Sequence, residues 1–129
     1  MPLVNIGRDL IAAALRGVPV NADFDAANTY IGVGDSSTAY AATQTDLVAA
    51  SNKLRKIVDS APGVAANVIT AVATFATGDA NFAWNEWAVF NHTSDTADAM
   101  LCRKVESLGT KTSAQSWQFT VTLTVAIGT

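Results

Sequence analysis

The side chains that could do acid–base or nucleophilic chemistry are few in this sequence and are not grouped. The single histidine, His92, opens a polar segment at 92–99, and the single cysteine, Cys102, lies in an apolar run. A Ser–His–acid triad would need this histidine beside a serine and an acid, whereas a lone loop histidine is usually solvated. A carboxylate pair could be assembled from Glu86, Glu106 and any aspartate, but the sequence gives no distance between them. We therefore predict a buried, unreactive thiol and no enzyme.

Two patterns of ligand-type residues are incomplete. Asp23 and Asp25 bracket a phenylalanine, but the spaced ligands and the glycine of a calcium loop are missing. Gly32 and Gly34 are followed by neither the Lys-Ser/Thr ending nor the helix of a phosphate loop, so we interpret them as turn residues. We predict no cofactor and no metal, and leave open a metal ion at the two aspartates or in the 92–99 loop.

The composition limits the classes of function. The chain has 129 residues, enough for one domain over 1–129, and 50% of them are hydrophobic while 15% are charged. Its net charge of −3 disfavours nucleic-acid binding. Neither a secretion leader nor an apolar run of about 20 residues is seen, so we expect no membrane association and synthesis in the cytoplasm. With so little charge, part of the surface is expected to contact other protein.

The element that must organise the chain is its last strand. From Ser116 to Ile127, apolar and polar residues alternate with a period of two, which predicts a half-buried β-strand. The alternate threonines tolerate water, so the other face is expected to pack on the core. The inward residues are predicted to be Trp117, Phe119, Val121, Leu123, Val125 and Ile127.

The remaining elements complete an all-β fold. Leu3, Ile6 and Leu10 recur at helical spacing and predict one amphipathic helix over 3–16, which either covers a sheet or docks on a neighbouring subunit. Strands are predicted near 29–33, 53–58, 67–75, 81–91 and 100–108, with one helical turn at 47–50. This order predicts an antiparallel β-sandwich, jelly-roll-like, over about 29–127.

Two features of these strands bear on contacts. The basic cluster of the sequence consists of Lys53, Arg55 and Lys56. We interpret it as a solvated strand face in preference to a contact with an acidic partner or phosphate. Trp84 and Trp87 lie three residues apart, on opposite faces of a regular strand. One of them is therefore expected in a second layer or at an interface.

Several segments, in this order, resemble small virion proteins of tailed bacteriophages. The similarity runs from about Asn5 to the end and departs at Ala88, where those proteins often have glycine, so that a bulge there is in doubt. The segments are Tyr30–Gly34, Thr45–Leu47, Asn85–Asn91, Met100–Val105, Lys111–Thr112 and Trp117–Val125.

The resemblance implies a non-enzymatic β-sandwich in the virion, either a capsid decoration or cement protein bound to the major capsid protein or a part of a tail fibre. It implies self-association, with a trimer expected because cement proteins often sit at three-fold positions, although other closed symmetries are equally allowed. An alternative is a carbohydrate-binding adhesin in which Trp84, Trp87 or Tyr40 stacks on a sugar. The candidate contact residues are Leu3, Ile6, Leu10, Asp35, Trp84, Trp87 and His92.

Overall fold

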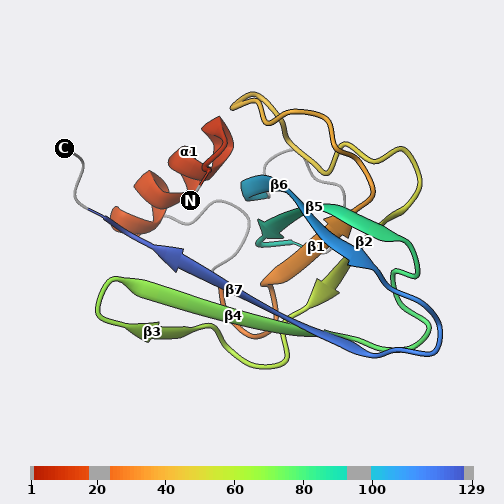
Figure 1. Cartoon of the computed structure of the whole chain (residues 1–129). Helices are drawn as coiled ribbons and strands as arrows, with labels where there is room; N and C mark the ends of the chain where they lie inside the picture. Colours follow the sequence, from red (N-terminus) through yellow and green to blue (C-terminus); the bar gives the residue numbers. More distant parts are fainter. Residues whose placement is uncertain (1, 18–23, 93–99, 127–129) are drawn as a thin grey trace.

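Two antiparallel sheets face each other in the computed structural model, which describes residues 2–17, 24–92 and 100–126 (Figure 1). The four-stranded sheet has the order β2-β1-β5-β6 and the three-stranded sheet the order β3-β4-β7. The predicted sandwich with an N-terminal helix is confirmed. The elements are α1 (Asn5–Leu15), β1 (Tyr30–Gly34), β2 (Lys53–Ile57), β3 (Gly63–Ala65), β4 (Val68–Phe75), β5 (Ala83–Phe90), β6 (Met100–Thr110) and β7 (Trp117–Thr124).

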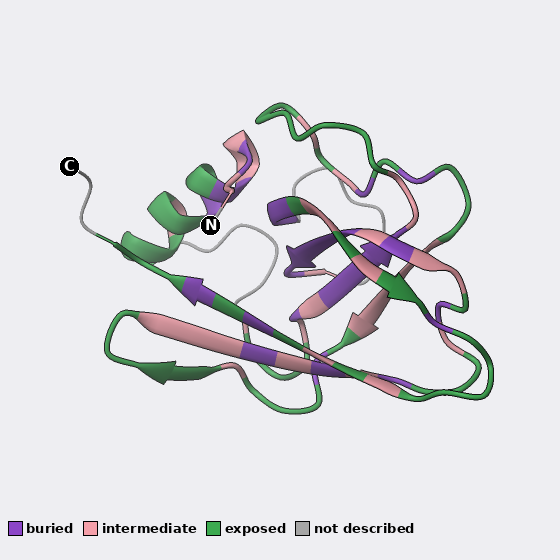
Figure 2. Cartoon of the chain, in the orientation of Figure 1, coloured by how far each residue is buried: buried purple, intermediate pink, exposed green. Residues whose placement is uncertain are grey.

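Strand β7 keeps the period of two that its sequence predicts. It pairs along its full length with β4, and Val121 and Leu123 are buried while the threonines between them are exposed (Figure 2). Trp117 and Phe119 also face inward and are half-buried. The prediction for Val125 is wrong, because this residue follows the end of the strand and is 60% exposed. Ile127 lies outside the described residues.

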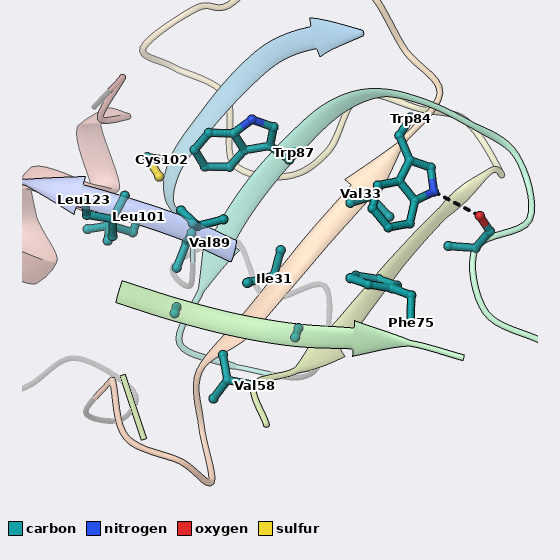
Figure 3. Close-up of a cluster of buried hydrophobic side chains, with 14 residues drawn as sticks. Ile31, Val33, Val58, Phe75, Trp84, Trp87, Val89, Leu101, Cys102 and Leu123 are labelled. Carbon is teal, nitrogen blue, oxygen red and sulfur yellow. Dashed lines mark hydrogen bonds between the residues drawn. The ribbon is translucent and has the colours of Figure 1, made fainter. Parts of the chain in front are cut away.

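The main core fills the space between the sheets and is built around Trp84. Phe75, Trp117 and Phe119 pack edge-on around its indole, with ring centroids 4.7, 5.0 and 6.0 Å away. The Trp84 Nε1–H donates a hydrogen bond of 3.0 Å to the carbonyl of Ala80 (Figure 3). The buried indole therefore contributes apolar area without an unpaired donor.

Both tryptophans of β5 face this core, and the pairing of β5 with β6 is irregular between them. The pairing of β5 with β6 shifts between Trp84 and Glu86, where Asn85 of β5 lies opposite three residues of β6, Glu106 to Leu108. The extra residues of this β-bulge therefore belong to β6. Trp84 and Trp87 are both buried in the same cluster. The expectation that one of them lies in a second layer or at an interface assumed regular alternation from Trp84 to Trp87, and the burial of both residues in one cluster contradicts it.

The outer face of the four-stranded sheet is covered by the chain itself. Phe90, Ala88 and Met100 form a second cluster there with Val4 and Leu47, under the segment 35–52. This segment contains no helical turn at 47–50, so that prediction is wrong. Its residues are held instead by hydrogen bonds to the sheet beneath.

Two glycines predicted as turn residues lie within β1 and make room for this covering layer. A Cβ atom on Gly32 would stand 2.7 Å from the Phe90 ring, and one on Gly34 would stand 2.5 Å from a carboxylate oxygen of Glu86. Both distances are shorter than van der Waals contact. These glycines therefore serve close packing, which a turn-like composition does not distinguish from chain reversal.

The orientation of β7 can be tested with one charge placed at two neighbouring positions. Val121→Asp buries an unpaired carboxylate between the sheets, which costs several kcal/mol against a typical total stability of about 5–15 kcal/mol. We expect insoluble or unfolded protein. Thr122→Asp places the same charge on the exposed face, and we expect a native circular dichroism spectrum and a cooperative thermal melt. Equal tolerance of the two substitutions would contradict the burial pattern.

Candidate assembly surfaces

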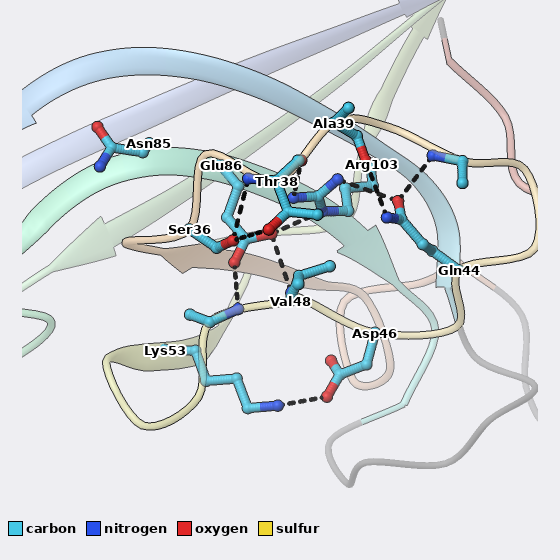
Figure 4. A network of polar contacts seen from close by, with 12 residues as sticks. Ser36, Thr38, Ala39, Gln44, Asp46, Val48, Lys53, Asn85, Glu86 and Arg103 are labelled. Carbon is cyan, nitrogen blue, oxygen red and sulfur yellow. Dashed lines mark hydrogen bonds and ion pairs between the residues drawn. The ribbon is translucent and has the colours of Figure 1, made fainter.

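A fully buried ion pair lies between β5 and β6 under the covering segment. Arg103 Nε donates to Glu86 Oε2 at 2.6 Å, and both side chains are 0% exposed. The same carboxylate accepts hydrogen bonds from the backbone N–H groups of Val48, at 3.0 Å, and Ala49, at 2.8 Å (Figure 4). Three donors thus satisfy the buried charge, as burial of a carboxylate requires.

The guanidinium extends the network to the other end of the segment. Arg103 donates to Gln44 Oε1 at 3.0 Å and to the carbonyl of Thr38 at 2.9 Å. Gln44 in turn binds the backbone of Ala39 and Ala41. One ion pair therefore fixes residues 38–49 on the sheet. This ion pair is not predicted from the sequence. The signal that could have indicated it was an acidic and a basic residue on adjacent strands, each within a largely apolar run.

The basic cluster at Lys53, Arg55 and Lys56 is not a uniformly solvated face. The Arg55 side chain is nearly buried, bridging Asp46 at 2.9 Å, and its guanidinium carbon lies 3.5 Å from the centroid of the Phe90 ring. Lys53 also binds Asp46, at 2.7 Å. Burial acts to raise the pKa of Asp46, but the hydrogen bonds from Lys53 and Arg55 outweigh it and hold the pKa below its ordinary value. These charges are therefore engaged within the chain.

The candidate contact residues on the helix are largely used inside the molecule. Leu10 is buried, and Leu3 and Ile6 are half-buried against the two core clusters. Gly7 allows the close approach, because a Cβ there would overlap the Leu101 carbonyl of β6. The helix thus covers the end of the four-stranded sheet, which is the first of the two roles predicted for it.

Asp35 and His92 lie at the ends of surface segments. The Asp35 carboxylate accepts a hydrogen bond of 2.8 Å from Asn52 and so closes the segment 35–52. The carbonyl of His92 accepts a bond of 3.3 Å from Arg55. The rest of the 92–99 loop lies outside the described residues. Asp35 and His92 are half-buried, and neither gathers with the other candidates into one site.

An apolar cavity of about 340 Å³ opens between α1 and the end of the sandwich. Thr29 is the polar residue among those lining it, and Leu15 at its rim is 85% exposed. The cavity therefore offers apolar contact but hardly any hydrogen-bonding group to orient a ligand. The apolar lining includes Leu10, Ile11, Phe24, Ile69, Leu123 and Val125.

The outer face of the three-stranded sheet differs from the other surfaces described above in its lack of charged residues. None of the residues in β3, β4 and β7 is Asp, Glu, Lys or Arg. The outer face carries Val68, Thr70, Val72 and Thr74 on β4, paired with Thr124, Thr122, Thr120 and Gln118 on β7. A solvent-facing sheet normally carries mixed charges, whereas the centre of a protein–protein contact is depleted of them. We call this outer face the threonine face.

Groups suited to bind a metal do not gather in the described ranges. No three His, Cys, Asp or Glu side chains there lie close enough to hold an ion. Asp25 accepts hydrogen bonds from the backbone of Ala27 and Asn28 and so shapes the turn before β1, while Asp23 lies outside the description. In the same ranges no helix is long and apolar enough to cross a membrane.

The buried ion pair can be tested with two substitutions. The first removes the arginine, and the second neutralises the glutamate that is then unpaired. Arg103→Met leaves Glu86 charged and buried, and we expect a loss of about 3–5 kcal/mol in the free energy of unfolding, measured by urea denaturation. Adding Glu86→Gln removes the unpaired charge and keeps one acceptor for the segment 38–49. The double variant should recover part of the loss. Full additivity of the two single losses would contradict the pairing.

The thiol of Cys102 supplies a second test. Burial raises its pKa to about 11, so almost no thiolate exists at pH 8. Because the thiolate is the reacting form, we expect alkylation of the native protein to be at least about a hundredfold slower than alkylation of the urea-unfolded chain. Equal rates would show that this strand is open to solvent.

Comparison of the chain with protein-family models, with curated proteins and with solved structures finds no match in any of the three.

Proposed function

We propose that this protein is a non-enzymatic structural component of a tailed-phage virion, made in the host cytoplasm and assembled on the particle. The favoured role is that of a capsid decoration protein that binds the shell of the major capsid protein and associates with copies of itself. The three-fold order expected for it comes from the resemblance alone. The phage origin is supported by the resemblance of several segments, in their order along the chain, to small virion proteins of tailed bacteriophages.

The uncharged three-stranded sheet is the observation that carries the assembly role. Charge-stabilised contacts such as Glu86–Arg103 and Asp46–Arg55 belong to the other sheet and its covering segment. The threonine face carries mainly methyl and hydroxyl groups, four exposed residues of β7 beside four half-buried ones of β4. At one end Thr74 donates a hydrogen bond of 2.7 Å to the carboxylate of Asp59. Away from the Asp59 end, this face can dehydrate without burying a charge, which makes it suitable for contact with a protein shell.

The carbohydrate-binding alternative has lost most of its support. Trp84 and Trp87 are buried in the core, and the Trp87 Nε1–H donates to Glu106 at 3.0 Å. Tyr40 is 40% exposed, but its hydroxyl is engaged with the Leu3 carbonyl. Of the three rings that the sequence indicated for stacking, Tyr40 alone is thus partly exposed, and we do not favour this function.

The proposed function can be tested on the particle itself. We expect mass spectrometry to find the chain in virions purified from the phage that encodes it, and the purified chain to co-sediment with capsids that lack it. Thr70→Lys places a charge on the threonine face and should abolish co-sedimentation while the thermal melt stays cooperative. Ser107→Lys adds the same charge on the other sheet and should leave co-sedimentation intact.

Absence of the chain from virions, together with no affinity for capsids, would contradict the decoration role. Binding that survives Thr70→Lys but is lost in Ser107→Lys would place the contact on the other sheet.

A further inference from the structure

We infer that strand β7 pairs edge to edge with β7 of a second copy of this chain, so that two three-stranded sheets join into one. This inference names a self-contact within the proposed assembly role and rests on that role for its purpose. It follows from a comparison of the four strands that end the two sheets, β2, β6, β3 and β7.

The edges at β2 and β3 carry the features that prevent strands from pairing between molecules. The sequence of β2 contains Lys53, Arg55 and Lys56, and charges on an edge strand oppose pairing. Strand β3 has three residues and is followed by Ala66 in the left-handed region, at a φ of 54°. A short, twisted edge offers few backbone groups to a partner.

The edge at β6 is partly occupied by the chain. Leu3 forms an isolated bridge with Cys102, and the Arg103 N–H donates to the Pro2 carbonyl at 3.2 Å. The second half of this strand carries Lys104 and Glu106, which form an ion pair of 3.4 Å. This edge therefore has both a cover and charges.

Strand β7 has none of these protections within the described residues. It has eight residues and pairs with β4 without a register shift, and it contains neither a proline nor a charged residue. A long, uncharged edge strand without a bulge is a template for another strand. Because one edge of this kind is present per chain, its natural partner is the same edge of another copy.

The backbone geometry identifies the groups available for pairing. The Val125 N–H donates to the Asn67 carbonyl at 2.8 Å, so the odd-numbered residues direct their peptide groups towards β4. The peptide groups of Gln118, Thr120, Thr122 and Thr124 consequently point to the free edge. Each of them needs a partner from water or from another strand.

One antiparallel register uses all four residues. It pairs Thr120 with Thr122 and Gln118 with Thr124 of the second copy, with the two-fold axis at Val121. Each of these hydrogen-bonded pairs exchanges two bonds, and β-branched cross-strand neighbours favour pairing. The same register brings Val125, which is 60% exposed, beside Trp117 of the second copy. A two-fold contact covers these apolar side chains, and it differs from the trimer that the resemblance implies.

Light scattering and native mass spectrometry of the purified chain test this inference without any capsid. We expect a mass twice the 13.4 kDa of one chain at high micromolar concentration. Thr122→Pro removes an N–H that β4 does not use, so the fold should persist as a monomer. Thr122→Val keeps this N–H and the β-branched shape, and should remain a dimer.

A cross-linking experiment reports the register even if the proline variant fails to fold. The double variant Thr120→Cys and Thr122→Cys should form a disulfide-linked dimer on oxidation, because hydrogen-bonded pairs have Cα atoms about 5.5 Å apart, which suits a disulfide. Gln118→Cys with Thr120→Cys should not cross-link, since those positions do not pair.

Edge pairing would be overturned by a monomer at every concentration, by a three-chain mass or by equal cross-linking of both double variants. None of these results would contradict capsid binding. A dimer that is absent from virions would overturn the proposed function alone.

Discussion

The difference between the two sheets of this molecule depends on one interaction, the buried ion pair of Glu86 and Arg103. This pair holds residues 38–49 over the outer face of the four-stranded sheet, through bonds to Val48, Ala49, Gln44 and Thr38. That sheet is therefore covered on both faces by its own chain. A buried ion pair contributes little net stability compared with an apolar pair, but it fixes one arrangement of a segment that lacks regular structure.

The consequence is an unequal distribution of charge between the sheets. Described ion pairs join strands or segments of the four-stranded sheet, and they extend to the turn at Asp79 through Lys56 at 2.7 Å. The three-stranded sheet has apolar residues inward and mainly threonine and valine outward, with no charged residue in its strands. One sheet thus serves the integrity of the fold, and the other is left chemically suited to contact a partner.

The parts of the fold that could be predicted from sequence are those governed by local periodicity. Strand β7 alternates cleanly because one of its faces is buried and the other is solvated, and the helix has a regular apolar stripe. The covering segment could not be predicted, since its conformation is set by long-range bonds to Glu86 and Arg103. The irregular pairing opposite Asn85 was also invisible, because a β-bulge leaves no compositional mark.

The candidate contact residues show the same difference between what local periodicity predicts and what long-range contacts determine. A regular strand would place Trp84 and Trp87 on opposite faces, whereas the structure buries both of them in the core. The threonine face and the free edge of β7 were not selected, although the alternation already displayed them. The signal that could have found them was the lack of charge over three successive strand segments, considered together with which strand ends a sheet.

Residue-resolved amide hydrogen exchange, measured by NMR at low and high protein concentration, tests the central claim most directly. The amides of Val121 and Leu123 bond to β4 and should be protected at both concentrations. The amides of Gln118, Thr120, Thr122 and Thr124 should exchange rapidly in dilute protein and become protected as the concentration rises. Rapid exchange of these four amides at every concentration would contradict the assignment of β7 as a contact edge between copies.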